Sequence, residues 1–297
     1  MNQSLHAVEP QKLLLATDLS AHCDRPLERA RQLAAEWQAE LAVLTVSEGP
    51  EVPAEVAGWL EGDDVHHAAE AAAQRALARE FDGSGIKLSL HLAEGPVADA
   101  IPAAAERLHS TLVIAGSARS ETLGHLLLGS TVERLARSLS QPLLVVRRRA
   151  QGSYRRILVP TDFSPGARMA LETAAALFPG RGLTVFHVQE TGMEALAGTM
   201  SANATDATAH AACARFLDSC RLPGGARERI ELVVGAGKLE TLLTRHVLEH
   251  DIELAVIGLH SQPGVLRVLM GNTADRLLRN LPCDTLLVRA GGRDDAS

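Results

Sequence analysis

RILVPTDFS, at residues 156–164, is the stretch that decides the fold, and KLLLATDLS, at residues 12–20, is its counterpart. Each is an aliphatic run followed by Thr-Asp-x-Ser, which is typical of a buried strand that leads into a capped helix. Three further pairs of blocks recur in the same order at an offset of 142 residues: LVIAG with LAVIG (112–116, 254–258), LLLGSTVERLARSLS with VLMGNTADRLLRNLP (126–140, 268–282), and LLVVR with TLLVR (143–147, 285–289). The chain is therefore predicted to be two tandem copies of one unit.

Short aliphatic runs alternate with segments of helical periodicity along both copies. In copy one, residues 13–16 and 112–115 are apolar without interruption, which is typical of strands buried on both faces. Between such runs, apolar side chains recur at helical spacing, as in Leu27, Ala30 and Ala34. The alternation predicts the α/β class, with two tandem, open-twisted, five-stranded parallel sheets of Rossmann-like type and helices on both faces.

The repeat also predicts the domain organisation. We expect one domain over residues 1–149, a second over 154–291, and a flexible tail over 292–297. The linker is expected at 148–154, because charge, glycine and serine interrupt the apolar pattern there.

Composition excludes several classes of function. With 46% hydrophobic and 22% charged residues, the chain is an ordinary globular protein. The formal net charge of −7 opposes binding of a polyanion, so no nucleic-acid partner is expected. No apolar run approaches the ~18 residues that a membrane span needs. The four cysteines form no CxxC pair, and a cytoplasmic location is expected.

The Thr-Asp pair after the first strand of each copy is the first candidate binding element. In an open parallel sheet, ligands bind beyond the carboxyl ends of the strands, where the strand order reverses. Thr17 and Asp18 in copy one, and Thr161 and Asp162 in copy two, are expected at that edge. A carboxylate there can accept hydrogen bonds from a ribose or from an adenine amino group. The same carboxylates can instead cap the following helix, and residue type alone leaves both roles open.

Two glycine turns follow in each copy. Gly116 and Gly258 come after the fourth strand, and Gly129 and Gly271 stand directly before a helix. Glycine lets the backbone approach an anion, and a helix N-terminus offers unpaired N–H groups and a favourable dipole. The sequence therefore predicts a phosphate-binding turn near the end of each copy, with helix capping as the alternative role of the polar residues beside it. Those polar residues are Ser130 and Thr131 in copy one, and Asn272 and Thr273 in copy two.

Together, PTDFS at residues 160–164 and the glycine turns resemble the universal stress protein family, specifically its tandem, two-domain members. The family pattern is G-x2-G-x9-G-(S/T) before a helix, and the resemblance covers nearly the whole chain. It implies an adenine nucleotide alpha hydrolase-like fold in each copy. It also implies binding of ATP or ADP, with or without magnesium, with the phosphates at the glycine turns. The implied adenosine contacts are Asp18 and Val46 in copy one, and Asp162 and Val188 in copy two.

Both copies depart from the family pattern at its second glycine. Counting from Gly116 leads to Arg119, and counting from Gly258 leads to Ser261. The Arg119 guanidinium can pair with a phosphate, or it can fill the space that a phosphate needs. In copy two, Asn272 replaces the usual small hydroxyl residue. The pockets are therefore expected to be unequal, with nucleotide bound in at least one copy.

No arrangement in the sequence points to a catalytic group or a metal site. His210, Cys213 and Cys220 share one face of a predicted helix, but a rise of about 1.5 Å per residue places the first and last about 15 Å apart. His187 precedes Val188 at a strand end, either as a site residue or as a histidine with a structural hydrogen bond. Three functions stay open: a stress-response module that binds an adenine nucleotide, an interaction scaffold with degenerate pockets, and a slow ATP hydrolase.

The last strand of each copy predicts a partner surface. Residues 143–147 and 285–289 are expected at sheet edges, and exposed edges can pair with another strand. The family resemblance implies that these two strands pair within one chain and form a pseudo-dimer. The sequence also leaves open whether two whole chains form a homodimer.

Overall fold

A computed structural model of the chain describes residues 11–18, 24–47, 71, 74–75, 77–79, 81–117, 121–122, 125–126, 130–189, 202–259 and 272–289. Contacts divide the chain into two compact units, hereafter unit 1 (Met1–Gly116 with Arg149–Ser153) and unit 2 (Ser117–Arg148 with Tyr154–Ser297). The end of copy one thus belongs to unit 2. The domain bounds expected from the repeat follow the sequence copies and stay a prediction, and the expected tail, 292–297, lies outside the described residues.

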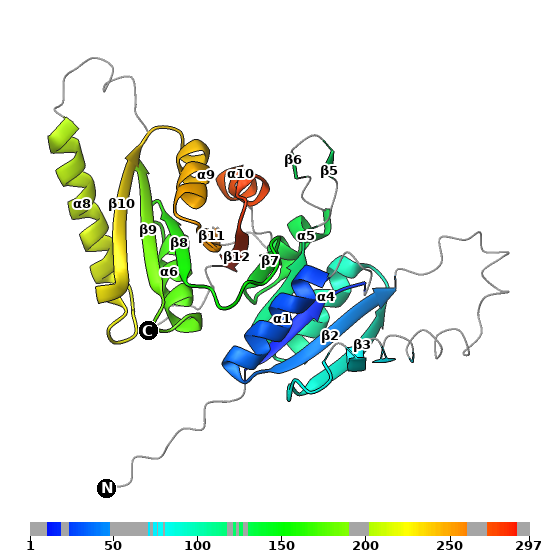
Figure 1. Cartoon of the computed structure of the whole chain (residues 1–297). Coiled ribbons are helices and arrows are strands. Elements are labelled where there is room, and N and C mark those ends of the chain that lie inside the picture. The colour runs from blue at the N-terminus through cyan, green and yellow to red at the C-terminus, as the bar shows by residue number, and fades with distance from the viewer. Residues whose placement is uncertain are drawn as a thin grey trace, which may run out of the picture. The chain divides into compact units, whose positions relative to one another are not determined.

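Unit 1 is built on a parallel sheet (Figure 1). Its elements are β1 (Lys12–Ala16), α1 (Asp24–Trp37), β2 (Glu40–Ser47), β3 (Leu88–Glu94), α4 (Val97–Arg107) and β4 (Leu112–Gly116). The strand order is β4-β1-β2-β3. Helix α1 packs on β1, β2 and β4, and α4 packs on β2. The side chains of residues 13–15 and 112–114 are completely buried, which accounts for the uninterrupted apolar runs in the sequence.

Unit 2 contains the whole of copy two and the end of copy one, from Ser117 to Arg148. The elements from copy one are β5 (Glu121–Thr122), β6 (His125–Leu126), α5 (Ser130–Ser138) and β7 (Leu143–Val146). Copy two supplies β8 (Arg156–Thr161), α6 (Pro165–Leu177), β9 (Gly182–Gln189), α8 (Ala202–Ser219), the 3₁₀ turn η2 (Arg227–Arg229), β10 (Ile230–Ala236), α9 (Leu239–Glu249), β11 (Leu254–Leu259), α10 (Asn272–Asn280) and β12 (Asp284–Arg289). Figure 1 shows α8 and α9 on opposite sides of the sheet, which has the order β10-β9-β8-β11-β12-β7.

The last strands of the two copies pair with each other in unit 2. Strand β12 runs antiparallel to β7, and Leu286 faces Leu144 at the centre of the pairing. The predicted pairing of these strands is thus confirmed. The α/β class is also confirmed, and the five strands of copy two, β8 to β12, are parallel as predicted. Strand β7 of copy one adds a sixth, antiparallel strand to the unit 2 sheet. This strand covers the edge that β12 would otherwise leave open.

A buried carboxylate holds both ends of the predicted linker. Asp284 is completely buried, and its Oδ1 accepts hydrogen bonds from the backbone N–H groups of Arg147 (2.7 Å) and Arg148 (2.9 Å). Its Oδ2 accepts from the hydroxyl of Tyr154 at 2.6 Å, and this tyrosine is itself buried. One side chain at the start of β12 therefore fixes the end of β7 and the approach to β8.

Candidate functional site

The carboxyl edge of the unit 2 sheet is where the described candidate residues of copy two lie. Strands β9 and β10 are on one side of β8, and β11 and β12 are on the other, so the strand order reverses between β8 and β11. Thr161 ends β8 in register with His187 of β9, and Val188 follows. Gly258 is near the end of β11, and Thr273 is in the first turn of α10. This is the position at which open α/β sheets bind ligands.

Side chains cap the backbone in the turn that follows β8. Thr161 Oγ1 accepts from the backbone N–H of Phe163 at 3.0 Å. Asp162 Oδ1 accepts from the backbone N–H of Ser164, also at 3.0 Å. Ser164 is the N-cap of α6, and its Oγ accepts from the N–H of Ala167 at 3.2 Å. Asp162 therefore supports the turn before α6, whereas the cap of the helix itself is Ser164, and the Asp162 side chain stays exposed at the sheet edge.

An aromatic cluster of Phe163, His187 and Phe216 lies beside this turn. The φ of Phe163 is +65°, which is uncommon for a residue other than glycine. Its ring centroid lies 4.3 Å from that of His187 and 5.6 Å from that of Phe216. Nδ1 of His187 is 2.9 Å from the carbonyl oxygen of Thr161, and since a carbonyl only accepts, Nδ1 carries the proton. His187 thus has the structural hydrogen bond that the sequence left open, and Nε2 of the neutral ring is an acceptor.

The close approach of α6 explains why residue 258 is glycine. A Cβ at Gly258 would lie 2.1 Å from the carbonyl oxygen of Gly166 and 2.8 Å from the nitrogen of Ala167. These are backbone atoms in the first turn of α6, so that turn rests directly on β11 at the point of strand-order reversal. Packing therefore requires this glycine whether or not a phosphate binds. The sequence pattern had explained this glycine only by the close approach of the backbone to a bound anion.

The candidate residues of copy one are divided between the two units. Asp18 is exposed and Val46 is half-buried in unit 1, where the strand order reverses between β1 and β4. Gly116 ends β4, and the nearest described atom to an added Cβ is Cγ of Pro26, at an ordinary contact distance of 3.4 Å. Among the described residues, no atom lies close enough to Gly116 to require glycine there, in contrast to Gly258 in copy two.

For the predicted phosphate-binding turns, the described residues begin with the helices that follow. Ser130 and Thr131 open α5, and Asn272 and Thr273 open α10, as the sequence predicts. The candidate residues that lie outside the described part of the chain are Arg119, Gly129, Ser261 and Gly271.

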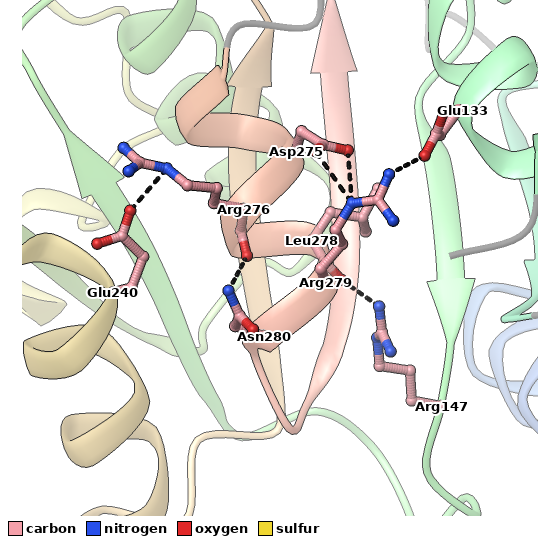
Figure 2. Close-up of polar contacts among 8 residues, drawn as sticks. All are labelled: Glu133, Arg147, Glu240, Asp275, Arg276, Leu278, Arg279 and Asn280. Atoms are coloured by element: carbon pink, nitrogen blue, oxygen red, sulfur yellow. Dashed lines mark hydrogen bonds and ion pairs between the residues drawn. The ribbon is translucent and has the colours of Figure 1, made fainter. Parts of the chain in front are cut away.

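Polar contacts fix α10 on two sides, as Figure 2 shows. Arg279 pairs with Glu133 of α5, and its Nε donates to the carboxylate of Asp275 at 3.0 and 3.1 Å. Hydrogen bonding to Asp275 raises the pKa of Arg279. On the other side, Arg276 pairs with Glu240 of α9 at 2.8 Å. Helices α5 and α10, which follow the glycine turns, are therefore joined within unit 2 by the pair of Arg279 with Glu133. The spacing of these residues in the sequence gives no indication of this contact.

Two further findings concern other classes of function. Within the described ranges, no three His, Cys, Asp or Glu side chains are grouped so that they could hold a metal ion. The helices in those same ranges include none with the length and apolar character that crossing a membrane requires.

The element order and the sheet topology together define an open α/β protein in which the strand order reverses in each copy. The model of the universal stress protein family matches residues 10–147 and, a second time, residues 153–289. The chain therefore belongs to the universal stress protein family, as a tandem member with two copies of the family unit.

Two solved structures share the fold over 95% of the chain. A universal stress protein from Archaeoglobus fulgidus DSM 4304 is 20% identical, with a TM-score of 0.68, covering 95% of this chain and 100% of that one. For a putative universal stress protein from Pseudomonas aeruginosa UCBPP-PA14 the identity is 19%, the TM-score 0.67, and the coverage 95% and 94%. A third, a universal stress protein in complex with cAMP, is 25% identical with a TM-score of 0.34, over 46% of this chain and 96% of its own. A comparison with curated proteins gave no match.

Proposed function

We propose that this tandem universal stress protein is a cytoplasmic stress-response module that binds an adenine nucleotide, ATP or ADP, in at least one of its two copies. The observation that carries the proposal is the position of Asp162, an exposed carboxylate where the strand order of the unit 2 sheet reverses. In this position it can accept hydrogen bonds from a ribose or an adenine amino group. Asp18 is the matching residue of copy one.

The remaining candidates would complete the site around this carboxylate. Val188, half-buried near the end of β9, offers apolar contact to a base. Asn272 and Thr273 open α10, and N–H groups at a helix N-terminus favour phosphate. Magnesium would arrive with the phosphates, because oxygen atoms of the nucleotide are its natural ligands.

One observation favours a second candidate function, an interaction scaffold with a degenerate pocket. The first turn of α6 rests on Gly258, at the place where the family pattern would bring a phosphate close to the backbone. A scaffold of this kind would keep the fold and bind no nucleotide. The two candidates therefore differ in a single measurable property.

Calorimetric titration of the full chain with ATP and magnesium separates these candidates. We expect saturable binding and an increase in Tm with ATP, since a ligand at 100 times its Kd stabilises by about 2.7 kcal/mol. Asp162→Asn keeps an acceptor for the Ser164 N–H group but removes the charge, and Asp18→Asn is the matched change in copy one. We expect affinity to fall by about tenfold or more in the variant of the occupied copy.

The control is Asp218→Asn, which changes an exposed carboxylate of α8 far along the chain from both turns. It should bind ATP like the unaltered chain. An absence of both heat and Tm change at millimolar ATP would overturn nucleotide binding and leave the scaffold.

A further inference from the structure

A cavity lined with basic residues lies at the opposite, amino edge of the unit 2 sheet. It has a volume of about 220 Å³ and lies where β8 and β9 begin, beside the end of α9. The proposed nucleotide site, at the carboxyl edge, does not use it. The charged and titratable residues of its lining are Arg155, Arg156, Arg229, Glu231, His246 and His250.

Two of the three arginines have guanidinium groups without a carboxylate partner in the described part of the chain. The third, Arg156, has Asp251 as its carboxylate partner. Its guanidinium lies 3.9 Å from the side-chain carboxylate of Asp251, and its Nε donates to the backbone carbonyl oxygen of the same residue at 2.9 Å. Arg155 uses its backbone N–H, which donates to Glu253 at 2.6 Å, and its side chain is exposed. Arg229 is also exposed, and the hydrogen bond that it donates within the described chain comes from its backbone N–H, not from its side chain. Guanidinium groups in a concave site are suited to binding an oxyanion.

The two histidines of the cavity stack on each other. The ring centroids of His246 and His250 are 4.2 Å apart. The centroid of the His246 ring lies 4.9 Å from that of Phe186, with the two ring planes inclined at 67°. Among the described residues, neither imidazole has a hydrogen-bond partner. Burial, and then the neighbouring His250, lowers the pKa of His246, while Glu231 and Glu249 act in the opposite direction. Protonating both rings therefore places two like charges side by side, and an anion next to them would relieve that repulsion.

Charge and size select the class of ligand. With neutral imidazoles, the lining has three positive groups and one carboxylate, and no metal-binding group of three side chains is present in the described residues. The volume of about 220 Å³ is below the roughly 300–1,000 Å³ of sites for drug-sized molecules. The carboxyl end of α9 opposes an anion through the helix dipole, and protonation of the histidines at that end offsets this effect. A small oxyanion is the ligand that fits.

We propose that this cavity binds a small oxyanion of the phosphate and sulfate class through Arg155 and Arg229, and that binding is coupled to protonation of His246 and His250. The coupling is reciprocal: the anion favours proton uptake, and proton uptake favours the anion. Affinity therefore rises as pH falls through the range in which the pair titrates. The other charged groups around the pair are Arg156, Glu231, Glu249, Asp251 and Glu253.

The test follows the ring NMR signals of the two histidines in the full chain during pH titrations in sulfate and in chloride of equal ionic strength. Sulfate keeps two negative charges between about pH 5 and pH 8, the range in which histidine titrates, so the ligand itself does not titrate. His246→Gln and His250→Gln assign the signals. We expect sulfate to raise the pKa of both rings by about one unit, which means about tenfold tighter binding for each ring that is protonated.

The double variant Arg155→Gln with Arg229→Gln is expected to lose the response to sulfate. Arg215→Gln, an exposed arginine of α8, is the charge-matched control and should keep it. Equal pKa values in the two salts would overturn the proposal, and so would a double variant that responds like the control. ATP binding, measured separately, is expected to be unchanged in the double variant, which keeps this test independent of the proposed function.

Discussion

Gly258→Ala is expected to destabilise unit 2 by about 3 kcal/mol or more, because overpacking is most costly where backbone has to move. The added Cβ would lie 2.1 Å from the carbonyl oxygen of Gly166 and 2.3 Å from its carbon. Backbone atoms cannot rotate away as a flexible side chain does, so α6 would have to move off β11. Because α6 also packs on β8, β9 and β12, the displacement would disturb much of this sheet. Urea unfolding followed by circular dichroism measures the loss.

Gly116→Ala is the matched control, since it makes the same change at the same place in the other copy. In the described part of the chain, the nearest atom to its added Cβ belongs to the Pro26 side chain, at 3.4 Å, and its φ lies outside the left-handed region. We expect the free energy of unfolding to change by no more than about 1 kcal/mol. The lower conformational entropy of the unfolded Gly116→Ala chain acts to stabilise the variant. Equal losses of stability in the two variants would contradict the steric explanation of Gly258.

Asp284→Ala is expected to cost about 4 kcal/mol, within the range measured when one partner of a buried charged network is removed. The change leaves the N–H groups of Arg147 and Arg148 and the hydroxyl of Tyr154 without their acceptor in a buried place. Burial lowers the pKa of Arg147, which shows that its charge is costly there, and the carboxylate of Asp284 acts against this. The same unfolding measurement gives the result.

Two variants show whether the network is the cause. Tyr154→Phe removes a single hydrogen bond and should cost about 1 kcal/mol. Asp218→Ala removes an exposed carboxylate that pairs with Arg227 at 2.8 Å, and should cost less than about 1 kcal/mol. A loss for Asp284→Ala no larger than that for Asp218→Ala would show that the buried carboxylate does not hold the linker ends.

Much of the fold could be predicted because its determinants are local. Residues 13–16 and 112–115 are uninterrupted apolar runs, and both became strands in which the side chains of residues 13–15 and 112–114 are completely buried. Asp284 could not be predicted in this way. A charged residue before a strand is typical of an exposed position, whereas its three partners lie 130 or more residues earlier in the chain.

In the candidate site, too, the features set by local sequence could be predicted, and those set by contacts between distant segments could not. The Thr-Asp turn could be placed from sequence, because the end of a buried strand fixes its position at the sheet edge. The role of Gly258 could not, because it depends on the first turn of α6, which meets β11 only in the folded sheet. Likewise, Phe163 and His187 stack because the ends of β8 and β9 lie side by side in the sheet. That proximity depends on the register of the two strands and cannot be read from the spacing of the residues in the sequence.

Photolabelling of the full chain with 8-azido-ATP, followed by mass spectrometry of the peptides, tests nucleotide binding at the strand carboxyl ends most directly. The reagent attaches at the base, so the expected labelled peptides lie within residues 18–46, within residues 162–188, or in both. An excess of ATP should abolish that labelling. Labelling that ATP does not reduce, or ATP-sensitive labelling confined to peptides outside both ranges, would contradict a nucleotide site at these edges.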